Sequence, residues 1–203
     1  MNSNVITQGV DAIALVDKEF ANALSTLGAP AAKVNPHGFE TFLSTIVSQQ
    51  LSTKVATVIM QRVKVLLKNV TPERVMEVAD QALRNAGLSW RKVEYAKGLA
   101  QAVLAGEFDI DGLDKLNDDE AITAITKLRG FGCWSAEIYL MFSLQRLDIF
   151  PADDLGLLVA LGKLKGLPEK PTAKQARDMV KHWSPWRSVG ALFLWEYYHK
   201  NDC

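Results

Sequence analysis

The stretch Leu128-Arg129-Gly130-Phe131-Gly132 lies between two segments of helical hydrophobic periodicity. Two glycines at positions i and i+2 allow positive φ angles and a close approach of the backbone. The turn leads directly into a new helix, whose first N–H groups and positive dipole end favour a phosphate group. Alone, such a turn is equally typical of a tight connection between packed helices, so its surroundings must decide between the two interpretations.

The rest of the chain is patterned as helix. Apolar residues recur three or four positions apart and sustained period-two alternation is absent, so we expect an all-α fold with almost no sheet. Thr71 before Pro72, and Thr172 with Gln175, are typical helix starts. The predicted helices cover about 10–27, 39–47, 55–67, a short one from 71, 90–104, 117–128, 133–145, 155–164, 173–182 and 187–199.

Composition excludes several classes of protein. The 203 residues carry 23 basic and 23 acidic side chains, a balance that excludes a polycation but allows a local basic patch. The two cysteines, Cys133 and Cys203, are too few for a disulfide scaffold or a four-cysteine metal site, and they suit a reducing compartment. No secretory signal or membrane-length apolar run occurs. We therefore expect a protein that is not secreted, in the cytoplasm with a bacterial nucleoid or in a nucleus.

A second informative segment, Asp148-Ile149-Phe150-Pro151-Ala152-Asp153-Asp154-Leu155-Gly156, follows the glycine turn by about twenty residues. Aspartate is a favoured N-cap, and apolar residues follow the acidic pair, so a helix start explains the pair without any chemistry. A capping carboxylate can also serve a reaction, so the two roles are compatible.

Together, LRGFGCWSAE at 128–137 and DIFPADDLGL at 148–157 resemble the helix-hairpin-helix DNA glycosylase superfamily, in particular its alkylation-repair branch of 3-methyladenine DNA glycosylases II. The resemblance covers about residues 35–198. It implies two packed helical subdomains within one unit of 1–203, with the active-site cleft between them. The subdomains would cover about 35–110, and about 111–203 with helix 10–27. Three further segments fit that branch: IVSQQLS at 46–52, GLS at 87–89 with Lys92 and Tyr95, and WSPWRS at 183–188.

The resemblance implies a monofunctional glycosylase that releases alkylated purines from duplex DNA. It assigns the catalytic carboxylate to Asp154, with Asp153 as the alternative. Cleavage of an N-glycosidic bond builds positive charge on the sugar, and a carboxylate at ~4 Å would stabilise that charge by roughly 4 kcal/mol at an effective dielectric of about 20. The same group could orient or deprotonate the attacking water. No histidine is an obvious general acid, and a cationic alkylated base needs none.

Such an enzyme must flip its target base out of the stack and hold it in a pocket. An electron-poor base suits aromatic walls, and the resemblance points to Trp134, Trp186 and Tyr139. The wedge that fills the vacated space is expected at Gln50, assisted by Leu51. The competing interpretations are core filling for the tryptophans and for Leu51, and helix capping for the glutamines.

Phosphate contacts are expected at the hairpin, from Leu128, Gly130, Gly132, Ser135 and Ala136. The family hairpin often holds a monovalent cation, so K⁺ or Na⁺ is expected at the Leu128 and Gly130 carbonyls when DNA is bound, with no cofactor required and no catalytic metal.

Relatives that cleave the strand carry a lysine two residues after the second hairpin glycine. Trp134 stands there and cannot act as the covalent amine, so no lyase activity is expected. The expected partner is damaged double-stranded DNA, bound by a monomer, with no membrane. Two rival functions remain open: a non-catalytic DNA-binding module, and a glycosylase for deaminated bases such as hypoxanthine.

Overall fold

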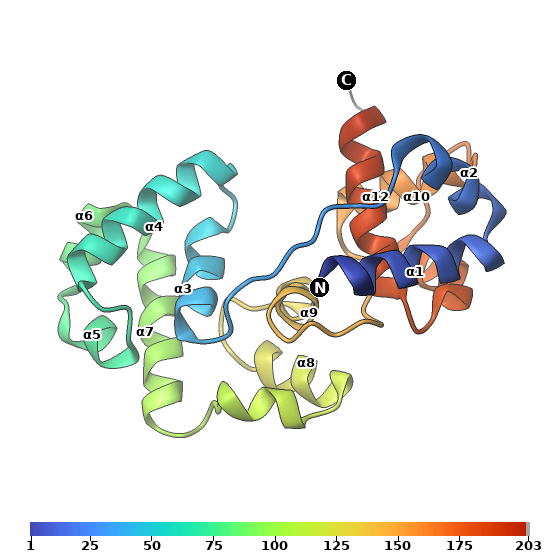
Figure 1. Ribbon diagram of the computed structural model, residues 1–203. Coiled ribbons are helices and arrows are strands. Elements are labelled where there is room, and N and C mark those ends of the chain that lie inside the picture. The colour runs from blue at the N-terminus through green and yellow to red at the C-terminus, as the bar shows by residue number, and fades with distance from the viewer. Residues whose placement is uncertain (202–203) are drawn as a thin grey trace. The chain divides into compact units, whose positions relative to one another are not determined.

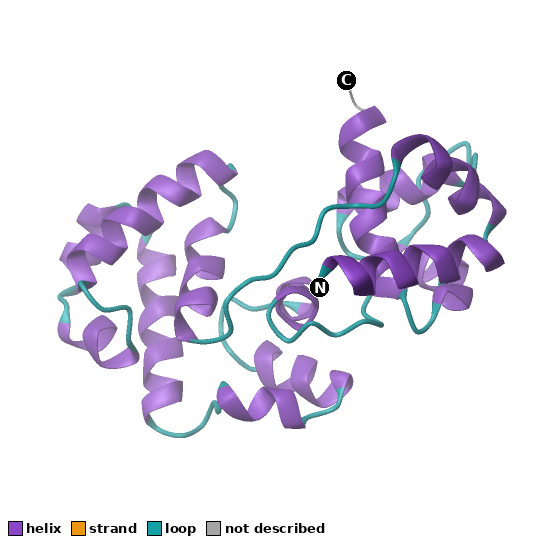
Figure 2. Ribbon diagram, in the orientation of Figure 1, coloured by secondary structure: helices purple, strands orange, loops and turns teal. Residues whose placement is uncertain are grey.

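The computed structural model describes residues 1–201, and every regular element in that range is a helix (Figures 1 and 2). Cys203 lies outside the described residues. The all-α class predicted from the hydrophobic periodicity is confirmed. Among the described helices, none combines the length and the apolar character that a membrane crossing requires.

The chain divides into two compact units. The central unit comprises residues 36–136, and the terminal unit joins residues 1–35 to those from 137 onward. The sequence analysis placed the later boundary near residue 110, but 111–136 packs within the central unit. One contact that holds this segment there is aromatic: the ring of Phe42 meets Phe131 at 5.5 Å between centroids, edge to face.

The central unit is built around one apolar core, to which its first five helices contribute. Leu43, Val63, Val75, Leu83 and Val93 are fully buried within it or nearly so. The helix α6 was not predicted; it is short and ends at Gly87, which has a left-handed φ of 118°. The elements are α3 (Phe39–Ser48), α4 (Thr53–Leu67), α5 (Pro72–Glu77), α6 (Asp80–Ala86), α7 (Trp90–Leu104), the 3₁₀ helix η1 (Asp111–Lys115) and α8 (Asp118–Thr126).

The terminal unit packs its helices around an aromatic core. The ring of Phe20 lies 4.3 Å from Phe193 and 5.4 Å from Trp183 between centroids. Helix α9 (Cys133–Phe142) begins in the central unit and continues into this one. The other elements are α1 (Ser3–Val16), α2 (Lys18–Leu27), α10 (Leu155–Leu164), α11 (Ala173–Met179), the 3₁₀ helix η2 (Lys181–Trp183) and α12 (Arg187–Asn201).

The single helix predicted over 10–27 is wrong, because the chain breaks at Asp17. This residue is extended, with φ −136° and ψ 103°, and its side chain caps α2 by accepting a hydrogen bond from the Phe20 N–H at 3.0 Å. Its other oxygen accepts hydrogen bonds of 2.6 Å from both Lys165 Nζ and Trp183 Nε1, and lies 2.9 Å from His182 Nε2.

Burial alone raises the pKa of Asp17, but its hydrogen bonds from Lys165, Phe20, Trp183 and His182 outweigh burial and hold the pKa well below its ordinary range. The break thus places a charged cluster inside the terminal unit, formed by Asp17 with Lys165, His182 and Trp183, which we call the charged hub.

Two other predicted helices are shorter than expected. The segment predicted over 133–145 leaves the helix after Phe142, and the one predicted over 173–182 ends at Met179, before η2. The predicted starts at Thr71 and at Thr172 with Gln175 are confirmed, and both threonine side chains accept the expected backbone hydrogen bonds.

Candidate functional site

Asp154 is held at the start of α10, as the capping pattern predicts. Its Oδ1 accepts hydrogen bonds from the Leu157 N–H at 3.0 Å and from the Trp195 indole N–H at 3.1 Å. Asp154 is half-buried, whereas the neighbouring Asp153 is exposed. Of the two aspartates, Asp154 is therefore the one whose carboxylate the fold fixes by a cap and by a side chain.

Trp195 on α12 is a functional candidate that the sequence analysis missed. Its helical spacing favoured a role in the core, yet its indole N–H reaches Asp154 and its ring stacks on Phe142 at 5.8 Å between centroids. The available signal was chemical: an indole N–H that is partly buried needs an acceptor. Trp195 thus orients the carboxylate while its ring fills space beside α9.

The loop that leads to Asp154 is fixed by the beginning of α12. Arg187 donates from Nε to Asp148 Oδ1 at 2.7 Å and from Nη2 to Asp148 Oδ2 at 2.8 Å, so the two side chains form a bidentate ion pair. Ser184 Oγ donates to the same carboxylate at 2.8 Å. Burial alone raises the pKa of Asp148, but these partners, Arg187 foremost, outweigh it and hold the pKa below its ordinary value.

Ser188 adds a second set of bonds to this loop. Its fully buried hydroxyl accepts a hydrogen bond from the Ile149 N–H at 2.9 Å and donates to the Arg146 carbonyl at 2.8 Å. Its backbone N–H donates to the Leu147 carbonyl at 2.9 Å. The WSPWRS and DIFPADD segments, far apart in sequence, therefore lock together.

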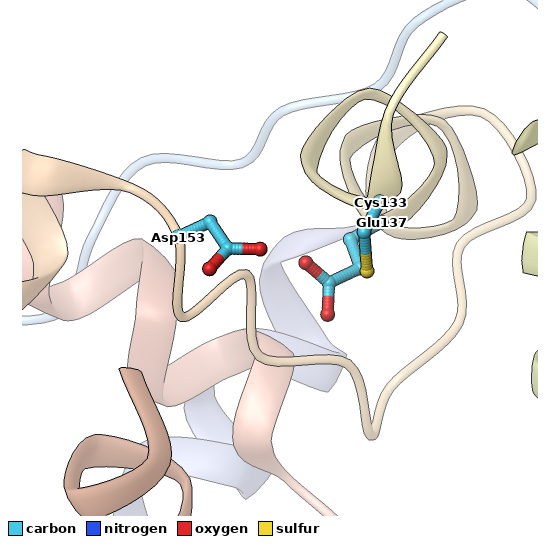
Figure 3. A group of neighbouring side chains, drawn as sticks. All are labelled: Cys133, Glu137 and Asp153. Carbon is cyan, nitrogen blue, oxygen red and sulfur yellow. The ribbon is translucent and has the colours of Figure 1, made fainter. Parts of the chain in front are cut away.

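A third support comes from α11. Arg177 Nη1 donates at 2.9 Å both to Glu137 Oε1 on α9 and to the Phe150 carbonyl in the loop. Figure 3 shows the carboxylates of Glu137 and Asp153 turned toward one another, and oxygens of the two lie within 4.8 Å. Cys133, one turn earlier on α9, brings its Sγ equally close to Glu137. Arg177 is thus the cation that compensates the buried Glu137 charge.

The hairpin uses its two glycines differently. Gly130 has a φ of 93°, and a Cβ added there would lie 2.4 Å from Tyr95 Cδ2, so only glycine fits. Gly132 is exposed, lacks a positive φ, and a Cβ added there would meet nothing within 4 Å. The protein itself therefore requires glycine at 130 but not at 132.

The remaining hairpin candidates have less open positions. Ala136 is fully buried, and its N–H donates to the Gly132 carbonyl at 3.1 Å, so that N–H serves the helix rather than a phosphate. Ser135 is also buried. The Leu128 carbonyl accepts a hydrogen bond from the Phe131 N–H at 3.1 Å, and the Gly130 carbonyl accepts one from Gln49 Nε2 at 2.6 Å. A carbonyl has two lone pairs, so each can still accept one more partner.

The wedge candidates lie in the connection between α3 and α4. Gln50 is exposed and has a left-handed φ of 56°, and Leu51 is 37% exposed. The core interpretation of Leu51 is therefore wrong. Neither Gln49 nor Gln50 caps α4, because Ser52 does so by accepting from the Val55 N–H at 3.4 Å.

The aromatic candidates differ in exposure. Trp134, in the first turn of α9, is 41% exposed, and Trp186 is half-buried. Tyr139 is 4% exposed, so the terminal unit leaves its ring little surface for a base. Trp90 at the start of α7 is 57% exposed beside the guanidinium of Arg84. The predicted base contacts of Trp134, Trp186 and Tyr139 stay predictions.

A glycine hairpin that opens one helix and a carboxylate that caps the next are the two features on which the resemblance to a DNA glycosylase superfamily rests, and comparison with known proteins tests that resemblance. The family model described as the HhH-GPD superfamily base excision DNA repair protein matches residues 43–185, and the chain belongs to that superfamily. The resemblance stated from the sequence is thereby confirmed.

Individual relatives are similar over most of the chain. DNA-3-methyladenine glycosylase 1 of Schizosaccharomyces pombe is 32% identical over 162 residues, covering 78% of this chain and 71% of that protein. The crystal structure of a Bacillus halodurans DNA-3-methyladenine glycosidase matches with a TM-score of 0.85 and 34% identity, over 94% of this chain and 88% of that one. An S. pombe 3-methyladenine DNA glycosylase solved in complex with abasic DNA matches with a TM-score of 0.79 and 28% identity, over 93% and 95%.

Proposed function

We propose that this chain is a monofunctional DNA glycosylase that hydrolyses the N-glycosidic bond of alkylated purines, of the 3-methyladenine type, in duplex DNA. The product would be an abasic site, as in base excision repair. The names of the relatives support the substrate class, since both the S. pombe protein and the B. halodurans protein are 3-methyladenine enzymes. The observation that carries the proposal is Asp154, a half-buried carboxylate held by the α10 cap and by Trp195.

The proposed chemistry needs a fixed negative charge beside the sugar. As the bond to the base breaks, positive charge develops on the deoxyribose, and Asp154 would stabilise it by roughly 4 kcal/mol at ~4 Å and an effective dielectric of about 20. That energy corresponds to about a thousandfold in rate. Because the Leu157 N–H and the Trp195 indole already orient the carboxylate, little reorganisation is needed as the charge appears.

An alkylated purine carries its own positive charge and leaves easily. The base therefore needs an electron-rich surface rather than a strong general acid. Trp134 offers such a surface at the start of α9, where 41% of the residue is exposed. In this proposal Trp134 and Trp186 stack against the flipped base, while Gln50 and Leu51 enter the helix in its place.

Two features bear on the finer assignments. Trp134 occupies the position where strand-cleaving relatives carry a lysine, and an indole cannot form a Schiff base, so the reaction would stop at the abasic site. The Leu128 and Gly130 carbonyls, each with one lone pair to spare, would hold a K⁺ or Na⁺ ion between the hairpin and a DNA phosphate. That ion would neutralise charge and take no part in bond cleavage.

The S. pombe structure in complex with abasic DNA supports damaged duplex DNA as the partner. We expect the chain to act as a monomer wherever the cell keeps its DNA, a bacterial nucleoid or a nucleus. Sedimentation of the free chain and of its complex with one duplex would test the monomer.

Release of bases from methylated duplex DNA tests the function. We expect the wild type to release 3-methyladenine and to leave abasic sites that break only on heating or in alkali. Asp154→Asn should lower the single-turnover rate about a thousandfold, whereas Asp153→Asn, the matched control, should stay close to wild type. Full activity in the Asp154 variant would move the catalytic role elsewhere.

Two other results would point to the rival functions. Release of hypoxanthine but no alkylated base would favour a deaminated-base glycosylase. Binding of duplex DNA without release of any base would favour a non-catalytic module.

A further inference from the structure

The loop that carries the wedge is held in an unusual backbone shape. Helix α3 ends at Ser48, and α4 begins only after the N-cap Ser52. Between them Gln50 takes a φ of 56°, a region that a side chain with a Cβ rarely adopts. One hydrogen bond, from the Leu51 N–H to the Ser48 carbonyl at 3.1 Å, closes the turn from within. Such a conformation persists only where its surroundings impose it.

Lys92 supplies the first of these constraints. It lies in the first turn of α7, and its Nζ donates to the Val47 carbonyl at 2.7 Å and to the Gln49 carbonyl at 2.8 Å. The last carbonyls of a helix have no partner inside that helix, so a cation here both satisfies them and complements the dipole. Burial lowers the pKa of Lys92, which shows that the ammonium has given up part of its hydration. Lys92 therefore fixes the two carbonyls that flank Ser48, in the segment that leads to the wedge.

Gln49 supplies the second constraint. Its side-chain Nε2 donates to the Gly130 carbonyl at 2.6 Å, so the wedge loop is bonded directly to the phosphate-binding hairpin. Tyr95, one turn after Lys92 on α7, packs against Gly130 as well, since an added Cβ would lie 2.4 Å from Tyr95 Cδ2. One turn of α7 thus contacts both loops, and Gln49 joins them to each other.

We infer that Gln49 and Lys92 are positioning residues that couple the hairpin to the wedge. Binding of a phosphate at the hairpin and insertion of Gln50 into the space that the flipped base vacates then occur together. This inference rests on the proposed function, because it assumes that Gln50 enters DNA. It adds two residues that touch neither the base nor the sugar. Loss of either one should leave duplex binding at the hairpin nearly intact while the wedge no longer inserts.

A double-mutant cycle tests the coupling. The probe is a duplex with a tetrahydrofuran abasic analogue opposite 2-aminopurine, whose fluorescence rises when the wedge displaces it from the stack. We expect Gln49→Leu and Gln50→Ala each to lower the rise at least fivefold, and the double variant to be no worse than Gln50→Ala alone. Gln61→Leu is the matched control, because Gln61 is exposed on α4 and distant from both loops in sequence. Thermal unfolding of each variant shows whether the fold is retained.

Independent effects that multiply in the double variant would overturn the inference, as would a normal fluorescence rise in Gln49→Leu. Lys92→Met removes the hydrogen bonds that α7 donates to the same loop, so it should lower the fluorescence rise as Gln49→Leu does. It replaces Gln49→Leu in the test if that variant fails to fold. Insertion into abasic DNA requires no base release. A wild type that inserts but releases no alkylated base would therefore overturn the proposed function while leaving the coupling standing.

Discussion

The two units hold their functional loops with different chemistry. In the terminal unit, carboxylates act as the fixing groups: Asp148 is gripped by Arg187, and Asp154 is oriented by Trp195. In the central unit, the fixing groups are neutral carbonyls, which accept from Lys92 and Gln49. Acid strong enough to protonate Asp148, whose pKa lies below its ordinary value, would release Arg187, but it leaves the carbonyls unchanged and keeps Lys92 charged. The loop that would perform the chemistry is therefore the acid-sensitive one, and the loop that would enter DNA is not.

The largest expected change in stability comes from a substitution that breaks the charged hub of the terminal unit. Asp17→Asn removes the buried charge that Lys165 faces, at a position where the Asp17 side chain is 0% exposed, and leaves Lys165 with the exposed Glu19 carboxylate at 3.2 Å, so we expect a loss of about 3 kcal/mol in the free energy of unfolding. Urea unfolding at neutral pH measures this loss. Asp11→Asn, exposed on α1, is the control and should change little.

The pH dependence of that loss has a definite sign. The pKa of Asp17 lies lower in the folded protein than its ordinary 3.8, so the unfolded chain binds more protons below that value. The difference in stability between wild type and Asp17→Asn should be constant above about pH 5 and shrink as the pH falls through 3.8. A difference that grew on acidification would contradict the assignment of the hub.

A change of intermediate size in stability should distinguish the two hairpin glycines of the central unit. Gly130→Ala forces a Cβ toward Tyr95 at a φ of 93°, and should cost about 2 kcal/mol in stability. Gly132→Ala meets no protein atom within 4 Å, so its stability should change by less than about 0.5 kcal/mol.

For affinity toward duplex DNA, unlike for stability, we expect Gly132→Ala to have a clear effect. If a phosphate passes over Gly132, the added methyl group should weaken duplex binding about tenfold, equivalent to about 1.4 kcal/mol. Fluorescence anisotropy with a short duplex measures it. If Gly132→Ala binds duplex DNA with unchanged affinity, the prediction that a phosphate contacts Gly132 is wrong.

A further effect of about the same size concerns the orientation of the Asp154 carboxylate. Trp195→Phe keeps a ring against Phe142 but removes the hydrogen bond to Asp154 Oδ1 at 3.1 Å. Because a hydrogen bond to a charged group contributes about 1.5 kcal/mol when partly exposed, the single-turnover rate of base release should fall about tenfold. Trp90→Phe in the central unit should leave that rate unchanged. An equal fall in both variants would mean that the rate reports general packing.

Local chemistry could be predicted from the sequence where a few adjacent residues determine it. The caps at Thr71 and Thr172 follow from their own neighbours, and so does Asp154 at the start of α10. The break at Asp17 could not be predicted in this way, because its partners Lys165 and Trp183 lie 148 and 166 residues away. An amphipathic pattern that runs through an acidic residue carries no sign of where a distant cation will lie.

The same limit applies to the candidate site. The DIFPADD and WSPWRS segments were both singled out, but their mutual locking through Asp148, Arg187 and Ser188 joins residues about forty apart in sequence. Trp195 could not be singled out, because helical spacing indicates the buried face of a helix and not the acceptor that an indole N–H will find. Gln49 was grouped with the wedge, since nothing local distinguishes a glutamine that enters DNA from one that binds a carbonyl.

The division of the chain also sets an order of assembly during synthesis. The central unit is one continuous segment, residues 36–136, whereas the terminal unit must join residues 1–35 to residues made after 136. As the chain leaves the ribosome, the central unit can complete its core while Asp17 still awaits Lys165, 148 residues downstream. Closing that long loop is entropically slow. The nascent protein can therefore form the loop at 48–52 and the glycine hairpin before the loop that carries Asp154 has a scaffold.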